Sequence, residues 1–194
     1  EAMEEGAVTV DSVTRKLPAP FIVLATQNHS GSAGTQLLPE SQLDRFMIRL
    51  SMGYPTVGEE TEILKAKSSK KAAPQVEPIM TAQDLIEIRS AAEDVFVSDE
   101  IYDYIARLSW ATRSDRRLEL GVSTRGSLAA AAMAKCAAMF KGRNFVIPED
   151  VTFVYTDVCA HRIIPARVKG KLPSDIEVRE ILCDICRGVT PPKI

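Results

Sequence analysis

Hydrophobic positions follow two different patterns along the chain. Up to residue 57 they form short β-prone runs, and beyond it they recur three or four residues apart. Ala7–Val10 and Val13–Lys16 flank the two-residue turn signal Asp11-Ser12, which predicts a hairpin. Phe21–Ala25 is continuously apolar, as in a strand buried on both faces of a parallel sheet. Phe46–Leu50 is a second such candidate, so the first 57 residues predict part of an α/β sheet.

Residues 58–194 are predicted to be almost entirely helical. Lys67–Pro78, rich in Lys, Ser, Ala and Pro, is predicted to be a linker. Pro148 predicts a helix that runs to about His161, and Gly188 a helix end. Polar capping residues predict four further helix starts, at Thr81, Ser98, Ser123 or Thr124, and Ser174.

The inner faces of these helices are expected to form the core. On the last helix this face carries Ile176, Ile181, Leu182 and Ile185. Trp110 is expected in the same core. The sequence therefore predicts a helical unit that buries its own apolar surface.

Composition narrows the class of protein. The chain has 194 residues, 45% hydrophobic and 26% charged, as in a globular protein, and a net charge of −2. That charge gives no bulk attraction to nucleic acid, so the basic clusters Lys65–Lys71, Arg113–Arg117 and Arg162–Lys171 are interpreted as linkers and solvated faces. The longest apolar stretch, Leu128–Phe140, is too short to cross a bilayer.

The start of the chain and its cysteines indicate a cytoplasmic protein. Glu1–Glu5 does not resemble a secretory signal, and four cysteines without one suggest free thiols in a reducing compartment. The absence of a methionine at position 1 suggests a processed or truncated chain.

Asn28 ends the first segment that could carry chemistry. It follows the predicted strand Phe21–Ala25, where open α/β sheets bind ligands. An amide at this place can orient a water molecule against a phosphate. The alternative is an asparagine that only makes a turn.

Two arginines define the other two segments. Arg45, in Pro39–Phe46, could stabilise phosphoryl transfer across a subunit boundary; the alternative is a surface pair with Asp44 or Glu40. Arg125, in Gly121–Leu128, lies in a first helical turn, where a cation opposes the helix dipole and could contact an anion. Its alternative is plain solvation.

In this order the three segments resemble the MoxR family of AAA+ ATPases, over nearly the whole chain. Glu1–Asp11 resembles the segment after the Walker B motif, and Phe21–Asn28 the sensor 1 strand. Glu40–Phe46 resembles the element bearing the trans-acting arginine, and Gly121–Leu128 the sensor 2 segment. Gly142–Val151 and His161-Arg162-Ile163 also resemble the family's lid.

The resemblance implies roles for single residues. Asn28 would be sensor 1, Arg45 the trans-acting arginine with Arg49 as fallback, and Arg125 the sensor 2 residue that binds the nucleotide. Residues 1–57 would be the C-terminal part of the AAA+ α/β core, and residues 58–194 an all-α lid. The family implies ATP and Mg²⁺ as cofactors, a ring oligomer, and chaperone-like remodelling of a client protein or metal-cofactor insertion.

One departure limits these expectations. The phosphate-binding motif G-x-x-x-x-G-K-[ST] and the Walker B acidic pair are absent from the 194 residues. The isolated chain is therefore predicted to be inactive. With part of a sheet uncovered, it is also predicted to self-associate.

Two rival interpretations remain. Cys183 and Cys186 form a C-x-x-C that, with Cys159 and His161, could hold zinc or act as a redox pair; two half-buried helix residues fit the spacing better. The second rival is a non-catalytic helical protein-interaction module, which would display an exposed apolar patch.

Overall fold

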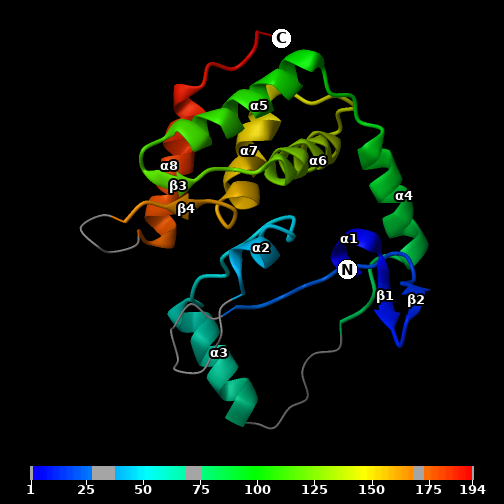
Figure 1. The fold of residues 1–194 in the computed structure, drawn as a ribbon. Helices are drawn as coiled ribbons and strands as arrows, with labels where there is room; N and C mark the ends of the chain where they lie inside the picture. Colours follow the sequence, from blue (N-terminus) through cyan, green and yellow to red (C-terminus); the bar gives the residue numbers. More distant parts are fainter. Residues whose placement is uncertain (1, 28–37, 69–75, 168–172, 194) are drawn as a thin grey trace.

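A computed structural model describes residues 2–27, 38–68, 76–167 and 173–193 (Figure 1). Most of the described chain is helical. The larger part is a bundle of α4–α8 in the upper half of Figure 1, with α1–α3 and the hairpin β1–β2 below it. The elements are α1 (Ala2–Glu5), β1 (Ala7–Val10), β2 (Val13–Lys16), α2 (Glu40–Leu43), α3 (Val57–Ser68), α4 (Ala82–Glu93), α5 (Asp99–Ser114), β3 (Leu118–Leu120), α6 (Thr124–Phe140), α7 (Pro148–Cys159), β4 (Ile164–Pro165) and α8 (Asp175–Gly188).

The predicted hairpin is confirmed. β1 and β2 pair antiparallel, from Ala7 opposite Lys16 to Val10 opposite Val13. The two turn residues both have positive φ, 51° and 63°. This is the turn geometry whose twist suits adjoining strands, and it explains why two polar residues connect them.

The two predicted core strands are wrong. Phe21–Ala25 and Phe46–Leu50 form no strand in the described residues. An extended segment becomes a strand only when a neighbour pairs with its backbone, and the described residues supply none here. Leu24, expected to be buried, is 91% exposed. Phe46–Leu50 instead contacts the bundle, where the Arg49 amide donates to the Asp157 carbonyl at 3.0 Å.

The helical bundle buries its own core, as predicted. α6 packs against α7 most extensively and also against α4 and α5. Close approach is possible because α6 presents small side chains: Ala130, Ala134 and Ala138 are fully buried. Met133 and Met139 pack against the same core. The N-termini of α4, α6 and α8 are capped by the side chains of Thr81, Ser123 and Ser174.

Some predictions inside the bundle need correction. Trp110 is 67% exposed and Ile176 is 70% exposed, because both lie on solvent-facing sides of their helices. Ser98 stands at the N-cap of α5 without a capping hydrogen bond from its side chain. The short antiparallel pair β3–β4 was not predicted, since strands of three and two residues give no sequence pattern.

Smaller differences concern boundaries. α7 ends at Cys159, two residues before the predicted end, and α3 runs into the predicted linker as far as Ser68. α8 ends at Gly188 as predicted. Within the described ranges no helix has the length and apolar character needed to span a membrane.

Candidate functional site

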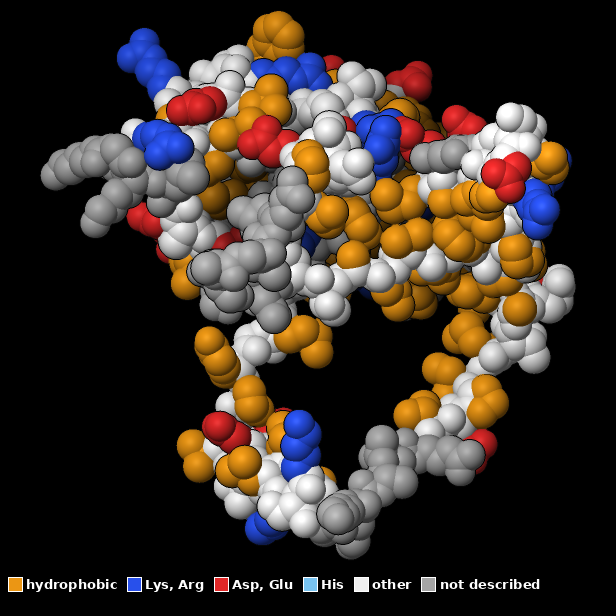
Figure 2. Space-filling view, turned by 60° about the horizontal axis from the view of Figure 1, so that its bottom comes forward, with side chains coloured by type: hydrophobic (Ala, Val, Ile, Leu, Met, Phe, Trp, Pro, Cys, Tyr) orange, Lys and Arg blue, Asp and Glu red, His pale blue; other side chains and the backbone are white. Residues whose placement is uncertain are grey.

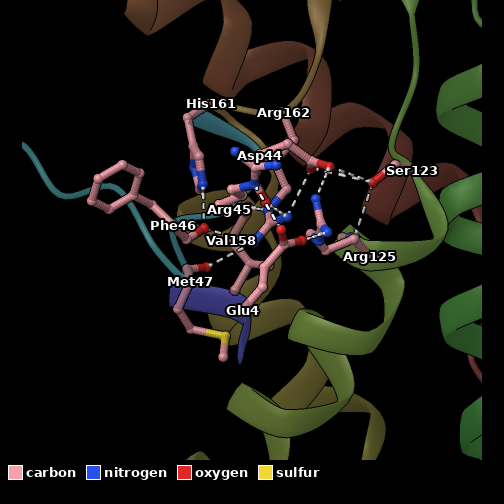
Figure 3. Close-up of polar contacts among 11 residues, drawn as sticks. Glu4, Asp44, Arg45, Phe46, Met47, Ser123, Arg125, Val158, His161 and Arg162 are labelled. Carbon is pink, nitrogen blue, oxygen red and sulfur yellow. Dashed lines mark hydrogen bonds and ion pairs between the residues drawn. The ribbon is translucent and has the colours of Figure 1, made fainter. Parts of the chain in front are cut away.

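The structure brings two of the three predicted site residues together. Arg45 follows α2, and Arg125 is the second residue of α6 (Figure 3). Both approach the same acidic side chain, Glu4 of α1. Asn28 lies outside the described residues, so its predicted role stays a prediction.

Glu4 is the centre of this arrangement. Its Oε2 lies 3.1 Å from Arg45 Nε. Its Oε1 accepts a hydrogen bond from Arg125 Nη2. One carboxylate therefore bridges two guanidinium groups from elements about 40 and 120 residues away in sequence. Arg45 thus pairs with Glu4 rather than with Asp44 or Glu40, and Arg125 is ion-paired while its side chain is 46% exposed.

Asp44 links α2 to the start of α6. Ser123 Oγ donates to its carboxylate, at 3.2 Å from both oxygens, and accepts from the Gly126 amide at 3.2 Å. Arg125 Nη1 lies 3.7 Å from Asp44 Oδ2. The residue that caps α6 thus also joins the helix to the segment that carries Arg45.

Arg162 fixes the backbone on both sides of Arg45. Its side chain is only 1% exposed and donates to Asp44 Oδ1 at 2.8 Å. It also donates to the Asp44 and Phe46 carbonyls, and to the Val158 carbonyl at the end of α7. A buried guanidinium needs such a full set of acceptors. The Arg45 segment is therefore tied to the bundle.

His161 makes a second tie beside it. Its Nε2 lies 2.9 Å from the Phe46 carbonyl oxygen and must donate, because a carbonyl only accepts. Burial lowers the pKa of His161, which outweighs the hydrogen bond to Phe46, and the nearby Arg162 lowers it further. The imidazole is therefore neutral near pH 7. Its Nδ1 is buried with no hydrogen-bond partner in the described residues.

Two glycines allow these elements to approach. A Cβ on Gly126 would lie 2.5 Å from Val122 Cγ1 and 3.2 Å from Arg162 Cδ. A Cβ on Gly121 would lie 2.6 Å from the Arg113 backbone nitrogen, which cannot move as a side-chain tip could. The Gly-x-x-x-x-Gly spacing in this segment therefore serves close packing.

A pocket of about 530 Å³ adjoins the cluster. Residues of α2, the segment after α5, the start of α6 and the segment after α7 line it. They include Glu40, Asp44, Gly121, Ser123, His161 and Arg162. A small ligand could thus reach the polar groups around Asp44.

Arg49, the fallback for the trans-acting role, belongs to a different cluster. It forms an ion pair with Asp175 at the start of α8. Arg179 of α8 bonds to the Arg49 carbonyl at 3.2 Å and to Asp157 at 2.6 Å. Burial and, less strongly, the charge of Arg179 lower the pKa of Arg49. Its contacts fasten the chain to α8 rather than to Glu4.

The cysteines form no site in the described residues. Cys183 and Cys186 lie on α8, and Cys159 is fully buried. Burial raises the pKa of Cys159 and of Cys186 to about 12, which leaves both as unreactive thiols near pH 7. Across the described ranges, no group of three or more His, Cys, Asp or Glu residues is placed to hold a metal ion.

Comparisons with known proteins agree with this architecture. The AAA lid domain family matches residues 110–181, and the ATPase family associated with various cellular activities matches residues 1–48. A crystal structure of a protein assigned as an ATPase from Cytophaga hutchinsonii superposes with a TM-score of 0.84 at 34% identity, over 100% of this chain and 61% of that chain. Fold and family matches together define an AAA+ ATPase with a lid domain.

Curated relatives narrow the class further. Over 185 residues the chain is 38% identical to the uncharacterized protein YeaC of Bacillus subtilis, covering 94% of this chain and 58% of YeaC. Over 173 residues it is 36% identical to the chaperone MoxR1 of Mycobacterium tuberculosis, covering 84% and 45%. The chain belongs to the MoxR-like AAA+ ATPases. It spans roughly half the length of these relatives.

Sequence reasoning missed the residues that connect the site. Glu4 and Arg162 had no assigned chemistry, and Asp44 was considered only as a surface partner of Arg45, although each lay in or beside a segment that resembled the family. Their contacts with one another, with Ser123 and with the two predicted arginines join residues 41 to 121 positions apart. No local pattern reports such distances; the only signal was a glutamate and an arginine inside otherwise recognisable motifs.

Proposed function

We propose that this chain is part of a MoxR-type ATPase that couples ATP binding and hydrolysis to remodelling of a client protein, or to metal-cofactor insertion. The family membership and the relative named as a chaperone support the reaction class. The single observation that carries the proposal is the meeting of Arg45 and Arg125 at one carboxylate. Paired guanidinium groups suit the charge of a phosphate chain.

The two family matches, over residues 1–48 and 110–181, support a division of labour between two parts of the chain. We propose that residues 1–57 belong to the nucleotide-binding core and residues 58–194 to the lid. Arg45 would act on the nucleotide of a neighbouring subunit in a ring. Arg125, which meets Arg45 at Glu4, would contact the same neighbouring nucleotide and report its state to the lid. Asn28 would orient water or sense the γ-phosphate.

Within the described residues, protein contacts can be proposed only for the phosphate groups of the ATP–Mg²⁺ complex. Arg45 and Arg125 would contact phosphate oxygens, and bound ATP would supply the transferable phosphoryl group. No described side chain is assigned to Mg²⁺. The four free cysteines fit the cytoplasmic location predicted from the sequence.

Arg45 provides the direct test in the full-length protein. Arg45→Ala should lower ATP turnover by about 10³-fold, as expected for loss of an arginine that stabilises phosphoryl transfer. Nucleotide affinity should change little, because in the full-length protein the glycine-rich loop of the subunit that holds the nucleotide supplies most of the phosphate contacts. Arg49→Ala is the control: it should keep turnover within about threefold, since Arg49 contacts α8. Retained turnover in Arg45→Ala would remove the assignment.

The 194-residue chain alone should neither bind ATP tightly nor hydrolyse it. Its sequence lacks the glycine-rich loop whose backbone amides hold phosphates. Isothermal titration calorimetry should find no micromolar ATP binding. Micromolar affinity would contradict this expectation.

A protein-interaction module is a second candidate, favoured by aromatic side chains on the bundle surface. Phe96, Phe140 and Phe153 are all more than half exposed, and other hydrophobic side chains lie open on the face shown in Figure 2. Self-association of the chain in sedimentation velocity would fit either candidate. Turnover that depends on Arg45 would favour the ATPase.

A further inference from the structure

The charges around Glu4 do not cancel. Three arginines (Arg45, Arg125 and Arg162) face two carboxylates, Glu4 and Asp44, within one connected set of ion pairs. This leaves a formal excess of one positive charge. Without Glu4 the excess would be two, which is the charge of a fully ionised terminal phosphate.

The two carboxylates are held differently. Asp44 is fastened by the buried Arg162 and by Ser123, and so belongs to the framework. Glu4 and its partners are only partly exposed side chains: that of Glu4 is 36% exposed, and those of Arg45 and Arg125 are 32% and 46% exposed. The Arg45 Nε atom itself is buried, and its contact with Glu4 is an ion pair without hydrogen-bond geometry. Exposed ion pairs are weak and exchange readily with other anions.

The position of Glu4 resembles that of a bound ligand. Each carboxylate oxygen faces one guanidinium group, as two oxygens of a phosphate would. Glu4 belongs to the four-residue helix α1, and the arginines to the segment after α2 and to α6 (Figure 3). An anion that replaced it could keep the arginines together while releasing α1.

We propose that Glu4 is a built-in competitor for the anion site formed by Arg45 and Arg125, and that a dianionic phosphate group displaces it on binding. This inference rests on the proposed function, in which both arginines contact nucleotide phosphate. In the state without ligand, Glu4 neutralises the arginines and keeps α1 against the start of α6. Removing its charge should therefore strengthen phosphate binding rather than weaken it.

The test is a titration of the 194-residue chain with inorganic tripolyphosphate at low ionic strength, in which isothermal titration calorimetry measures the affinity. Glu4→Gln keeps the size of the side chain and removes the charge, so it should bind about tenfold more tightly than the wild-type chain. Glu5→Gln is the matched control, because it removes the same charge from the same short helix and no ion pair of Glu5 is found in the described residues. It should bind within about twofold of the wild-type chain.

Further variants distinguish the competitor role of Glu4 from the phosphate contacts of the two arginines. In the Glu4→Gln background, Arg45→Gln and Arg125→Gln should each lower the affinity for tripolyphosphate. If they do so but Glu4→Gln binds no more tightly than Glu5→Gln, the competitor role of Glu4 is overturned and the arginine pair stands. If neither arginine affects binding, the proposed phosphate contact fails as well. Circular dichroism confirms that each variant retains the wild-type fold.

Discussion

The two ends of the molecule use hydrophobic residues in opposite ways. In the bundle α4–α8, apolar side chains from four helices interlock, and Leu108 and Tyr155 are fully buried. In residues 1–57, apolar side chains such as Leu24 and Met52 are almost fully exposed. The helices of the bundle pack against one another, whereas the predicted strands have no pairing partner in the described residues.

The two regions differ in whether the contacts that their structure needs come from nearby or from distant parts of the sequence. A hairpin forms in the N-terminal part because its two strands and its turn are adjacent in sequence. The run Phe21–Ala25 has stronger strand propensity, yet it needs neighbours from elsewhere. The Glu4 cluster and the contacts of Arg49 with Asp157 and Asp175 join the two parts, and there residues far apart in sequence decide the geometry.

The largest expected effect contrasts the two regions directly. Leu108→Ala removes a fully buried side chain of the bundle and should cost roughly 2–5 kcal/mol of unfolding free energy. Leu24→Ala makes the same chemical change at an exposed position and should cost less than about 0.5 kcal/mol. Urea titrations followed by circular dichroism measure both. Equal losses would mean that residue 24 is buried in solution.

The next largest loss of unfolding free energy is expected at Asp150. Its carboxylate is fully buried and accepts hydrogen bonds from Arg143, Lys141 and the Ile147 amide. Asp150→Asn should cost about 2–4 kcal/mol, because it leaves cations without their partner. Glu62→Gln, which breaks an exposed pair with Lys65 on α3, should cost less than about 0.5 kcal/mol.

The same residue predicts a pH dependence. Burial would raise the pKa of Asp150, but hydrogen bonds from Arg143, the Ile147 amide and Lys141 outweigh it and leave the pKa below its ordinary range. The folded state therefore binds the proton less well than the unfolded state, where the pKa is about 3.9. This stabilisation is full above that pH and is lost as the pH falls further. Asp150→Asn should flatten this part of the acid dependence; an unchanged slope would contradict the assignment.

The smallest effect concerns helix caps. Ser123→Ala removes the acceptor for the Gly126 amide and the donor to Asp44, and should cost about 1 kcal/mol. Ser98→Ala, at an N-cap without a capping side-chain bond, should cost less than about 0.5 kcal/mol. Thermal unfolding of the two variants distinguishes them, and equal shifts would exclude a specific role of Ser123.

Much of the bundle was predictable because its signals are local. Thr81 with Asp84, Ser123, Ser174 and the first-turn proline Pro148 mark helix starts that the structure confirms. It was harder to predict which side of each helix packs against its neighbours. Trp110 is apolar in type but faces solvent, which depends on where neighbouring helices pack.

The candidate site was predictable only in part. Arg45 and Arg125 were predicted as candidates from their segments, but their meeting point at Glu4 was not. Glu4 lies 121 positions from Arg125, and Arg162 lies 118 positions from Asp44. Contacts of this kind follow from the packing of α1, α2 and the bundle, which no periodicity in the sequence encodes.

The central claim is that Arg45 and Arg125 act on the same anion, and a double-mutant cycle on ATP turnover of the full-length protein tests it most directly. Arg45→Ala should lower turnover by about 10³-fold and Arg125→Ala by about 10²-fold. If the arginines act together, the double variant should lose little more than Arg45→Ala alone. A loss equal to the product of the two single losses would show that they act independently and would contradict the account.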